Sequence, residues 1–366
     1  MGMLANANSV KNKKKILIVD DSALMRRVIC DIIDSDSTFQ AKDVCRDGLE
    51  AYEKLKTTTY DAVVLDINMP RMDGLELLQK LQQDGIKATV IVVSTLTTKG
   101  ADVTIRAMEL GAVDFITKPC NIIEAKSDEF RRRILQMLKA VIRSDDAKVQ
   151  AAETVKDSPI KMPKKLERTG TSGKKVLVAL ACSTGGPKAL QSVIPYLPRD
   201  LNAPMVLVQH MPIGFTKSMA DRLNELSDIE VREAEEGDVL KKGCVYVAPG
   251  GKHMEIKKQA DGSHVVRLNE EPAIGGLRPC ANVTYESLRT SGYDEIVCVV
   301  LTGMGSDGTG GILSLNSKKK IYVISQDAAS CVVYGMPKAI ADAGVVDEVV
   351  PLTEIAHTII KKVGVQ

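Results

Sequence analysis

Short apolar runs rich in β-branched residues alternate with amphipathic stretches along most of this chain. Because parallel strands joined by helices are buried on both faces, this alternation predicts parallel sheets covered by helices on both sides. The predicted strands are KILIVDD, FQAKDVC, DAVVLD, ATVIVVS and VDFIT in the first part of the chain and KVLVALAC, APMVLVQH, GCVYVAP, EIVCVVLT and IYVIS in the second.

The alternation stops between residues 144 and 174. This stretch is polar, contains two prolines and two glycines, and has no sustained hydrophobic period, so we interpret it as a flexible linker. We therefore predict the α/β fold class, with two doubly wound parallel-sheet domains at residues 15–138 and 175–366 joined by this linker.

Composition narrows the range of partners and compartments. The 366 residues carry 49 Lys and Arg against 47 Asp and Glu and contain no Trp, so neither a basic surface nor a base-stacking platform for nucleic acid is expected. The eight cysteines form no Cys-x-x-Cys pair, which favours a reducing cytoplasm over a disulfide framework or zinc site. Apolar runs such as VLVALAC are too short for a membrane helix, and the first residues lack the apolar stretch of a signal peptide.

Charged and hydroxyl side chains follow the predicted strands of the first domain. Asp20 and Asp21 close KILIVDD, Asp66 closes DAVVLD, and Ser94 and Lys118 follow two further strands. Carboxyl ends of parallel strands meet at one edge of a sheet, so these side chains are expected to lie together. Clustered carboxylates fit Mg²⁺, and the complete set suits an acyl phosphate, although each Asp taken alone is equally well explained as a helix cap.

The motifs IVDDS, VVLDINMPRMDG, VVST and DFITKP resemble the receiver domain of bacterial response regulators, which implies a flavodoxin-like fold. The resemblance implies a phosphoacceptor, Asp66, and a Mg²⁺ site near the acidic pair. It also implies a switch hydroxyl, a switch aromatic residue that is equally well explained as a core ring, and a lysine before a cis proline. The implied metal-site residues are Asp20, Asp21, Asp66 and the backbone carbonyl of Asn68, and the implied switch residues are Ser94, Phe115 and Lys118, with the cis bond at Pro119.

One segment of the second domain indicates a different chemistry. Gly303, Gly305 and Gly308 have the G-x-G-x-x-G spacing of a dinucleotide site, and Asp327 follows at the distance of a ribose-binding acid. Against this alternative, Asp307 would place a carboxylate in the turn that should receive the pyrophosphate. A nucleotide-binding α/β enzyme therefore stays open as the less favoured interpretation.

Ser183, His210 and Asp307 each follow a predicted strand of the second domain. A hydroxyl, an imidazole and a carboxylate at three strand ends match the logic of a Ser-His-Asp triad. Taken alone, Ser183 is explained better as the N-cap of a helix that has Pro187 in its first turn. The other three histidines lie in polar or helical surroundings, where surface or hydrogen-bonded roles are expected.

The motifs ACSTGGP, VQHMPIGFT, YVAPGG, LTGMGSDG and QDAASCVVYGMP resemble the catalytic domain of CheB-type chemotaxis protein-glutamate methylesterases, and the arrangement of receiver, linker and this domain is that family's. The resemblance implies a Rossmann-like catalytic domain with Ser183 as nucleophile, His210 as general base and acid, and Asp307 as its orienting partner. The turn at Met304 is expected to donate its N–H to the oxyanion.

The implied activity is hydrolysis of glutamate methyl esters on chemoreceptors to glutamate and methanol, together with glutamine deamidation, without a cofactor for ester hydrolysis. A chemotaxis histidine kinase is the implied phosphodonor, and Mg²⁺ belongs to the receiver. The chain departs from the family pattern at Ala181 and Cys182, where a Gly-Ala pair is usual, and at Asn282, where Asp is common. These departures support the remaining alternative, a receiver-controlled receptor-binding module without activity.

Overall fold

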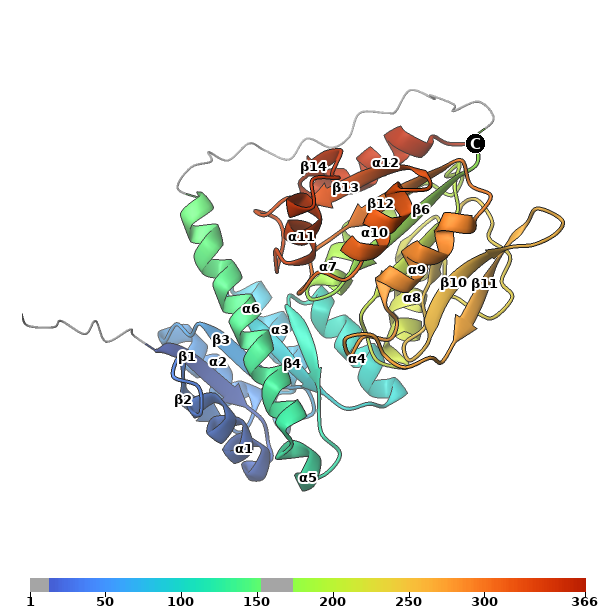
Figure 1. Cartoon of the computed structure of the whole chain (residues 1–366). Coiled ribbons are helices and arrows are strands. Elements are labelled where there is room, and N and C mark those ends of the chain that lie inside the picture. Colours follow the sequence, from blue (N-terminus) through green and yellow to red (C-terminus); the bar gives the residue numbers. More distant parts are fainter. Residues whose placement is uncertain (1–12, 153–173) are drawn as a thin grey trace, which may run out of the picture. The chain divides into compact units, whose positions relative to one another are not determined.

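The computed structural model describes residues 13–152 and 174–366, which form two compact units (Figure 1). One unit contains residues up to 95 together with 110–142, and the other contains residues 96–109 together with those from 143 onward. Helix α4 (Thr98–Glu109) is thus grouped with the second unit, although the sequence assigns it to the first predicted domain.

The first unit is built on a five-stranded, fully parallel sheet in the order β2-β1-β3-β4-β5. This is the doubly wound order of flavodoxin-like folds, as predicted. Its strands are β1 (Lys14–Val19), β2 (Phe39–Cys45), β3 (Ala62–Asp66), β4 (Val90–Ser94) and β5 (Asp114–Thr117). Its helices are α1 (Ala23–Asp34), α2 (Gly48–Thr57), α3 (Gly74–Gln83), α5 (Ile122–Ala125) and the part of α6 (Asp128–Ala152) up to residue 142.

Local sequence determines where the first helices begin. The side chains of Ser22, Asp47 and Asp73 cap α1, α2 and α3 by accepting the N–H of a residue in the first turn. Asp73 and Glu76 form a complete capping box at α3. These caps fix the helix starts directly after the strand ends, where the polar side chains gather.

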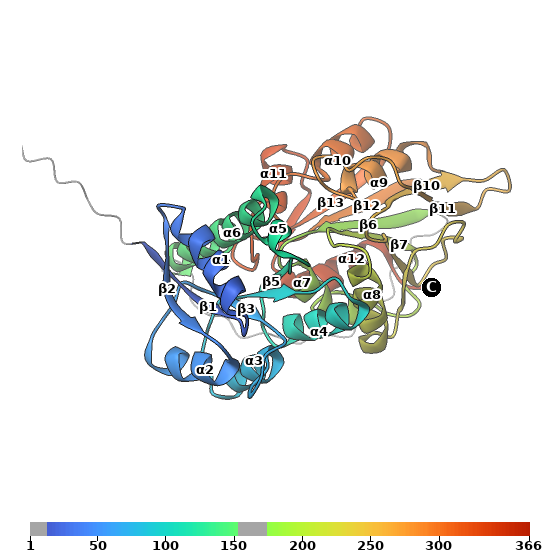
Figure 2. The ribbon, with the colours of Figure 1, turned by 90° about the horizontal axis from the view of Figure 1, so that it is seen from below.

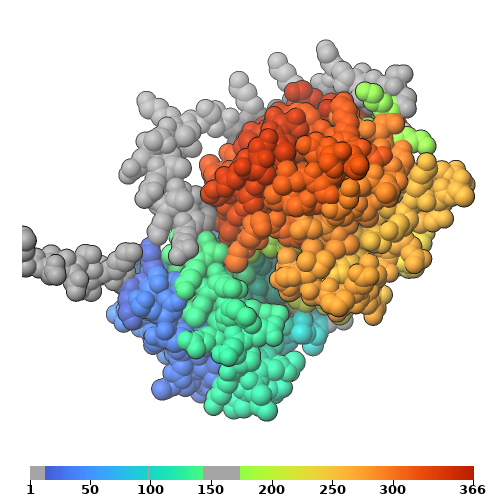
Figure 3. All heavy atoms as spheres, in the orientation of Figure 1, coloured from blue at the N-terminus to red at the C-terminus, as the bar shows by residue number. Residues whose placement is uncertain are grey.

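The second unit contains a seven-stranded parallel sheet in the order β14-β13-β12-β6-β7-β9-β8 and a separate antiparallel hairpin. The sheet strands are β6 (Val176–Cys182), β7 (Met205–Gln209), β8 (Glu230–Glu233), β9 (Cys244–Val247), β12 (Glu295–Val300), β13 (Lys320–Gln326) and β14 (Glu348–Val350). The hairpin pairs β10 (His253–Lys258) with β11 (His264–Asn269), and Figure 3 shows it on the outer surface of this unit, coloured yellow to orange.

Helices cover both faces of the seven-stranded sheet (Figure 2). On one face Tyr285, Ile312 and Met336 pack with Ala179 and Cys298 of the central strands. The helices are α7 (Gly186–Gln191), α8 (Phe215–Leu226), α9 (Ala281–Ser287), α10 (Thr309–Asn316), α11 (Met336–Asp342) and α12 (Ile355–Val363), with 3-10 turns at Ile194–Tyr196, Leu288–Thr290 and Leu352–Glu354. Within the described residues, no helix combines the length and apolar content needed to cross a bilayer.

The prediction of two doubly wound parallel sheets is confirmed, but the sequence pattern misses four strands. Strands β8 and β14 are three or four residues long and carry charged residues, and the hairpin strands are half-exposed, so none shows a long apolar run. Helix α6 continues to Ala152, into the predicted linker, and the rest of that stretch, residues 153–173, lies outside the described residues, as do residues 1–12.

Candidate functional site

The acidic residues of the first unit meet at the carboxyl ends of neighbouring strands. Strand β1 pairs with β3 up to Val19 and Leu65, so Asp20 and Asp66 follow side by side. Carboxylate oxygens of Asp20, Asp21 and Asp66 all lie within 4.8 Å of one another. The side chains of Asp20 and Asp66 are 1% and 3% exposed, so their negative charges are largely removed from water.

The ammonium group of Lys118 contacts two of these carboxylates. Its Nζ lies 2.7 Å from Oδ2 of Asp66 and 3.0 Å from Oδ2 of Asp20. Burial nevertheless raises the pKa of Asp66, more than the pairing with Lys118 lowers it. Three carboxylates and one ammonium leave an excess of about two negative charges when all are ionised, which a divalent cation would neutralise. The donor set is therefore compatible with Mg²⁺, with Asp20, Asp21 and Asp66 as the residues available to hold it.

The other predicted receiver residues surround this cluster. Ser94 is the buried last residue of β4, and its carbonyl accepts the N–H of Lys118 at 2.6 Å. Phe115 lies in β5 and is partly exposed, so it is not a fully buried core ring. Asn68 is exposed, two residues past Asp66. The cis bond expected at Pro119 is wrong: among the described residues, the cis peptide is Arg278–Pro279, and the bond before Pro119 is trans.

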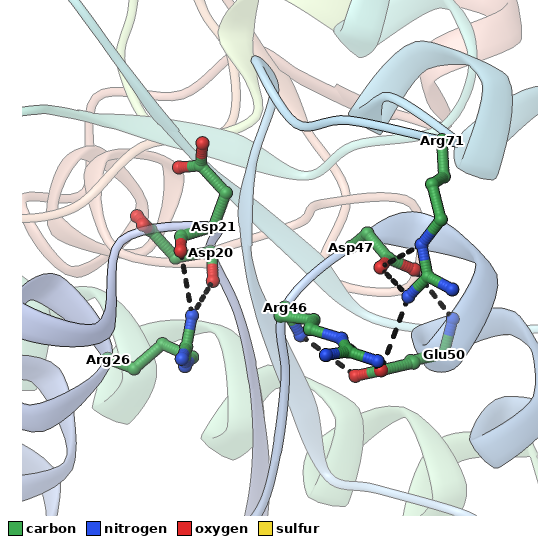
Figure 4. Close-up of polar contacts among 7 residues, drawn as sticks. All are labelled: Asp20, Asp21, Arg26, Arg46, Asp47, Glu50 and Arg71. Carbon is green, nitrogen blue, oxygen red and sulfur yellow. Dashed lines mark hydrogen bonds and ion pairs between the residues drawn. The ribbon is translucent and has the colours of Figure 1, made fainter.

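Sequence reasoning misses two arginines that hold the loops around this site (Figure 4). Nη1 of Arg26 donates to the carbonyls of Asp20 and Asp21, at 2.7 and 3.0 Å, and so fixes the acidic pair from its backbone side. Nε of Arg71, in the loop after β3, donates at 2.7 Å to Asp47, the buried N-cap of α2. Arg71 has φ 66°, a left-handed conformation that is uncommon outside glycine. No local sequence pattern indicates either contact, since both partners are distant or are backbone atoms.

In the second unit, Ser183, His210 and Asp307 follow three neighbouring strands. Strand β6 lies between β7 and β12, at the point where the strand order reverses, which is where doubly wound sheets bind their ligands. Ser183 follows β6 directly and its N–H donates to Thr302, which follows β12, at 3.0 Å. His210 follows β7 directly and its N–H donates to the carbonyl of Cys182 at 3.3 Å. The topology therefore brings the three residues to one edge.

Asp307 and His210 are joined by a buried hydrogen bond. Nε2 of His210 lies 2.8 Å from Oδ2 of Asp307, and the two side chains are 7% and 6% exposed. Backbone N–H groups of Ala281, at 2.6 Å, and Asn282, at 3.0 Å, also donate to the carboxylate. Although burial opposes ionisation, these donors and His210 lower the pKa of Asp307 to about 2. Asp307 is thus a fixed negative charge beside the imidazole.

The second nitrogen of the His210 imidazole is not used in a hydrogen bond to any residue that the structure describes. Nδ1 of His210 is buried and makes no hydrogen bond within the described parts of the chain. Because β6 and β7 pair up to Cys182 and Gln209, the next residues, Ser183 and His210, are neighbours across the strand ends. With Nε2 bonded to Asp307, Nδ1 is the nitrogen left to accept a proton from the Ser183 hydroxyl.

The glycine-rich turn after β12 lies directly against the serine. A Cβ on Gly303 would approach Cβ of Ser183 to 2.8 Å, so only glycine permits this contact. The N–H of Gly303 donates to Val333 at 3.0 Å, whereas the N–H of Met304 has no acceptor among the described residues. Met304, the residue after Gly303, therefore has an unused backbone donor in the turn that contacts the serine, and an oxyanion would require such a donor.

Two groups that a dinucleotide would need already have hydrogen-bond partners in the protein. The N–H of Gly308, which should bind a pyrophosphate, donates instead to Oδ1 of Asp307 at 2.9 Å and to Oδ1 of Asn282 at 3.1 Å. Asp327 caps a turn by accepting the N–H of Ser330 at 3.0 Å. Both features that suggested a nucleotide therefore have structural roles.

The two departures from the family pattern leave this geometry intact. Cys182 is fully buried, and burial raises the pKa of its thiol, so it is not a competing nucleophile. Oδ1 of Asn282 accepts the N–H of Gly308 and, at 2.7 Å, that of Gly311, so it caps the start of α10.

His253 and His264 are buried in the hairpin rather than at the surface, and Nε2 of His264 accepts the N–H of Gly292 at 2.8 Å.

Two family models match separate parts of the chain. Residues 16–127 match the family model described as response regulator receiver domain, and residues 178–359 match the one described as CheB methylesterase. A Syntrophomonas wolfei protein named protein-glutamate methylesterase/protein-glutamine glutaminase 1 is 40% identical over 351 residues, 95% of this chain and 99% of the relative. A Bacillus subtilis protein named protein-glutamate methylesterase/protein-glutamine glutaminase is 40% identical over 348 residues, 94% and 97% of the two chains.

A solved structure is similar to part of the chain. The crystal structure of the Thermotoga maritima CheB methylesterase catalytic domain is 41% identical and covers 53% of this chain and 100% of its own, with a TM-score of 0.49.

Proposed function

The chain belongs to the CheB methylesterase family with a receiver domain, and we propose that Ser183, His210 and Asp307 carry out its ester hydrolysis. It is an enzyme of the protein-glutamate methylesterase/protein-glutamine glutaminase class. Its proposed substrates are methylated chemoreceptors. The observation that supports the assignment of residues is the buried bond between His210 and Asp307, at the sheet edge where Ser183 follows strand β6.

The geometry supports a two-step acyl transfer. Oγ of Ser183 attacks the ester carbonyl of a methylated glutamate while Nδ1 of His210 takes its proton. The N–H of Met304 stabilises the oxyanion, and Asp307 stabilises the imidazolium through Nε2. His210 then protonates the departing methoxide, which leaves as methanol. Water activated by the same imidazole releases the glutamate, and a glutamine amide reacts likewise with loss of ammonia.

The receiver supplies the regulation in this proposal. A histidine kinase of the chemotaxis system is the phosphodonor and Asp66 the acceptor, and the phosphoryl group adds about −1.5 to −2 charge beside Lys118 and Ser94. Mg²⁺ bound with Asp20, Asp21, Asp66 and the carbonyl of Asn68 would neutralise phosphoryl oxygens. Phosphorylation, read through Ser94, Phe115 and Lys118, then raises ester hydrolysis. The eight free cysteines support a cytoplasmic location.

Methanol release from methylated receptor membranes tests the assignment. The intact protein, supplied with Mg²⁺ and a small phosphodonor, is compared with Ser183→Ala and with Ser192→Ala, which removes a hydroxyl at the end of α7. We expect Ser183→Ala alone to abolish release. Equal release from Ser183→Ala would exclude this nucleophile, and no release from any of the three proteins would favour a binding module instead. Asp66→Asn is expected to lose the stimulation by phosphodonor and to keep the basal rate.

A further inference from the structure

The side chain of Gln209 lies buried between the two strand ends that carry Ser183 and His210. Gln209 is the last residue of β7 and is 2% exposed. Its Nε2 donates to the carbonyl oxygen of Ser183 at 3.1 Å and to that of His210 at 3.2 Å. A buried amide that bridges the proposed nucleophile and the proposed base takes no part in the chemical steps above.

Backbone pairing between the two strands ends just before the reacting residues. The register runs up to Cys182 and Gln209, and the last backbone hydrogen bond between these strands is the one from His210 to Cys182. Beyond it, the chain turns toward α7 on one side and α8 on the other. The Gln209 amide therefore links Ser183 to His210 by hydrogen bonds, in the place where a further backbone hydrogen bond between the two strands would lie.

The chemistry of this position calls for an amide. Two carbonyl oxygens converge on one atom, so that atom must carry two protons, which the NH₂ group of Gln provides and a carboxylate does not. Oε1 accepts the thiol of Cys182 at 3.0 Å, and this fixes the orientation of the amide. A Cβ on Gly186 would overlap Oε1 of Gln209, so the glycine after the nucleophile turn leaves room for this group. Cys182, unlike an alanine, adds a third hydrogen bond to the amide.

We propose that Gln209 is a positioning residue that holds the Ser183 hydroxyl within reach of Nδ1 of His210. The inference rests on the proposed roles of those two residues. Gln209 does not touch the substrate, so its loss changes the alignment of nucleophile and base and not the affinity for the receptor. Misplacement of reacting groups by about 1 Å costs on the order of 100-fold in rate.

The test measures kcat and KM for methanol release by the full-length protein with Gln209→Met, which keeps the length of the side chain and removes both donors. We expect kcat to fall about 100-fold while KM stays within about twofold. Tyr246→Phe is the matched control. Tyr246 lies in β9 of the same sheet, and its hydroxyl donates to the carbonyl of Val239 and accepts the N–H of Lys241, so the substitution also removes a hydrogen-bonding group. It should leave kcat unchanged even where it lowers the melting temperature.

A folded Gln209→Met protein with the parent kcat, or with a raised KM and unchanged kcat, would overturn the proposal. If that variant does not fold, Gln209→Glu replaces it. A protonated acid keeps one donor, so kcat should be intermediate and fall as the pH rises and the acid ionises. Parent-like kcat across the pH range would refute the bridge. Ser183→Ala, assayed in parallel, separates the outcomes: activity there overturns the proposed function itself.

Discussion

Replacing Asp307 by Asn is expected to damage both the stability and the activity of the catalytic domain. Each carboxylate oxygen accepts backbone donors: Oδ2 takes the N–H of Ala281, and Oδ1 takes those of Asn282 and Gly308. An amide has one acceptor and one donor side, so in either orientation its NH₂ group faces a backbone N–H. Asn is therefore a poor replacement here, although it has almost the same shape as Asp.

The magnitude follows from the pKa of Asp307. The pKa is lowered from 3.8 to about 2, which at about 1.36 kcal/mol per unit corresponds to roughly 2.5 kcal/mol. A carboxyl whose pKa is lower in the folded state stabilises the fold above its unfolded pKa, and this stabilisation disappears as the pH falls through the folded pKa. An unpaired N–H adds about 1–3 kcal/mol. Together, these two effects are expected to lower the free energy of unfolding of Asp307→Asn by about 3.5–5.5 kcal/mol at pH 7. The difference from the parent should narrow between about pH 4 and pH 2.

Urea unfolding followed by circular dichroism measures this difference, since the chain contains no Trp to report by fluorescence. Asp342→Asn is the control, because Asp342 pairs with Lys338 on the surface with both side chains more than half exposed. It should change stability by less than about 0.5 kcal/mol. Loss of the carboxylate in a triad lowers kcat by about 10⁴-fold. Parent-like stability of Asp307→Asn at pH 7, or a difference that stays constant down to pH 2, would refute the reasoning.

Three further predictions concern other parts of the chain. Chelation of divalent ions should slow phosphorylation of Asp66 by a small phosphodonor, measured by phosphate-affinity electrophoresis, while basal methanol release stays constant; equal loss of both would contradict it. Glu295→Gln removes the buried carboxylate that pairs with Lys320 and Lys362, and should lower the free energy of unfolding in urea by about 1–2 kcal/mol. In thiol titration with an aromatic disulfide, exposed Cys120 should react first and half-buried Cys30 next, the rest only after denaturation; rapid reaction of more than two thiols would contradict the described burial.

The positions of the proposed functional residues follow from the rule that residues after parallel strands lie at one edge of the sheet, and this rule can be applied to the sequence alone. Once the apolar runs are recognised as parallel strands, the polar residues just past them must share an edge. Asp20 and Asp66, and likewise Ser183 and His210, were expected together on this ground, and the structure places them side by side. Strand order could not be read from the pattern, yet it decides that β6 lies between its two partners.

Gln209 and Asn282 show what the pattern cannot give. Both are ordinary polar residues at the ends of elements, and their importance lies in which distant backbone groups they meet. Which nitrogen of His210 faces Asp307 depends in the same way on a loop nearly 100 residues away in the chain. Such contacts depend on tertiary packing. The only local sign of them in the sequence is a polar residue at a position where an apolar one would be expected.

Each of the two sites lies at the carboxyl edge of its own sheet, but the charge of the carboxylates is balanced differently in the two. Around Asp66, three carboxylates lie together and, among the residues that the structure describes, one ammonium group pairs with them, so the excess negative charge is left for a cation to balance. Around Asp307, one carboxylate is surrounded by backbone N–H groups and an imidazole, so its charge is balanced within the protein. A site that depends on an added ion is suited to a reversible change of charge, whereas a site that is balanced internally keeps one geometry through every turnover. The first arrangement suits a regulatory input and the second a catalytic output.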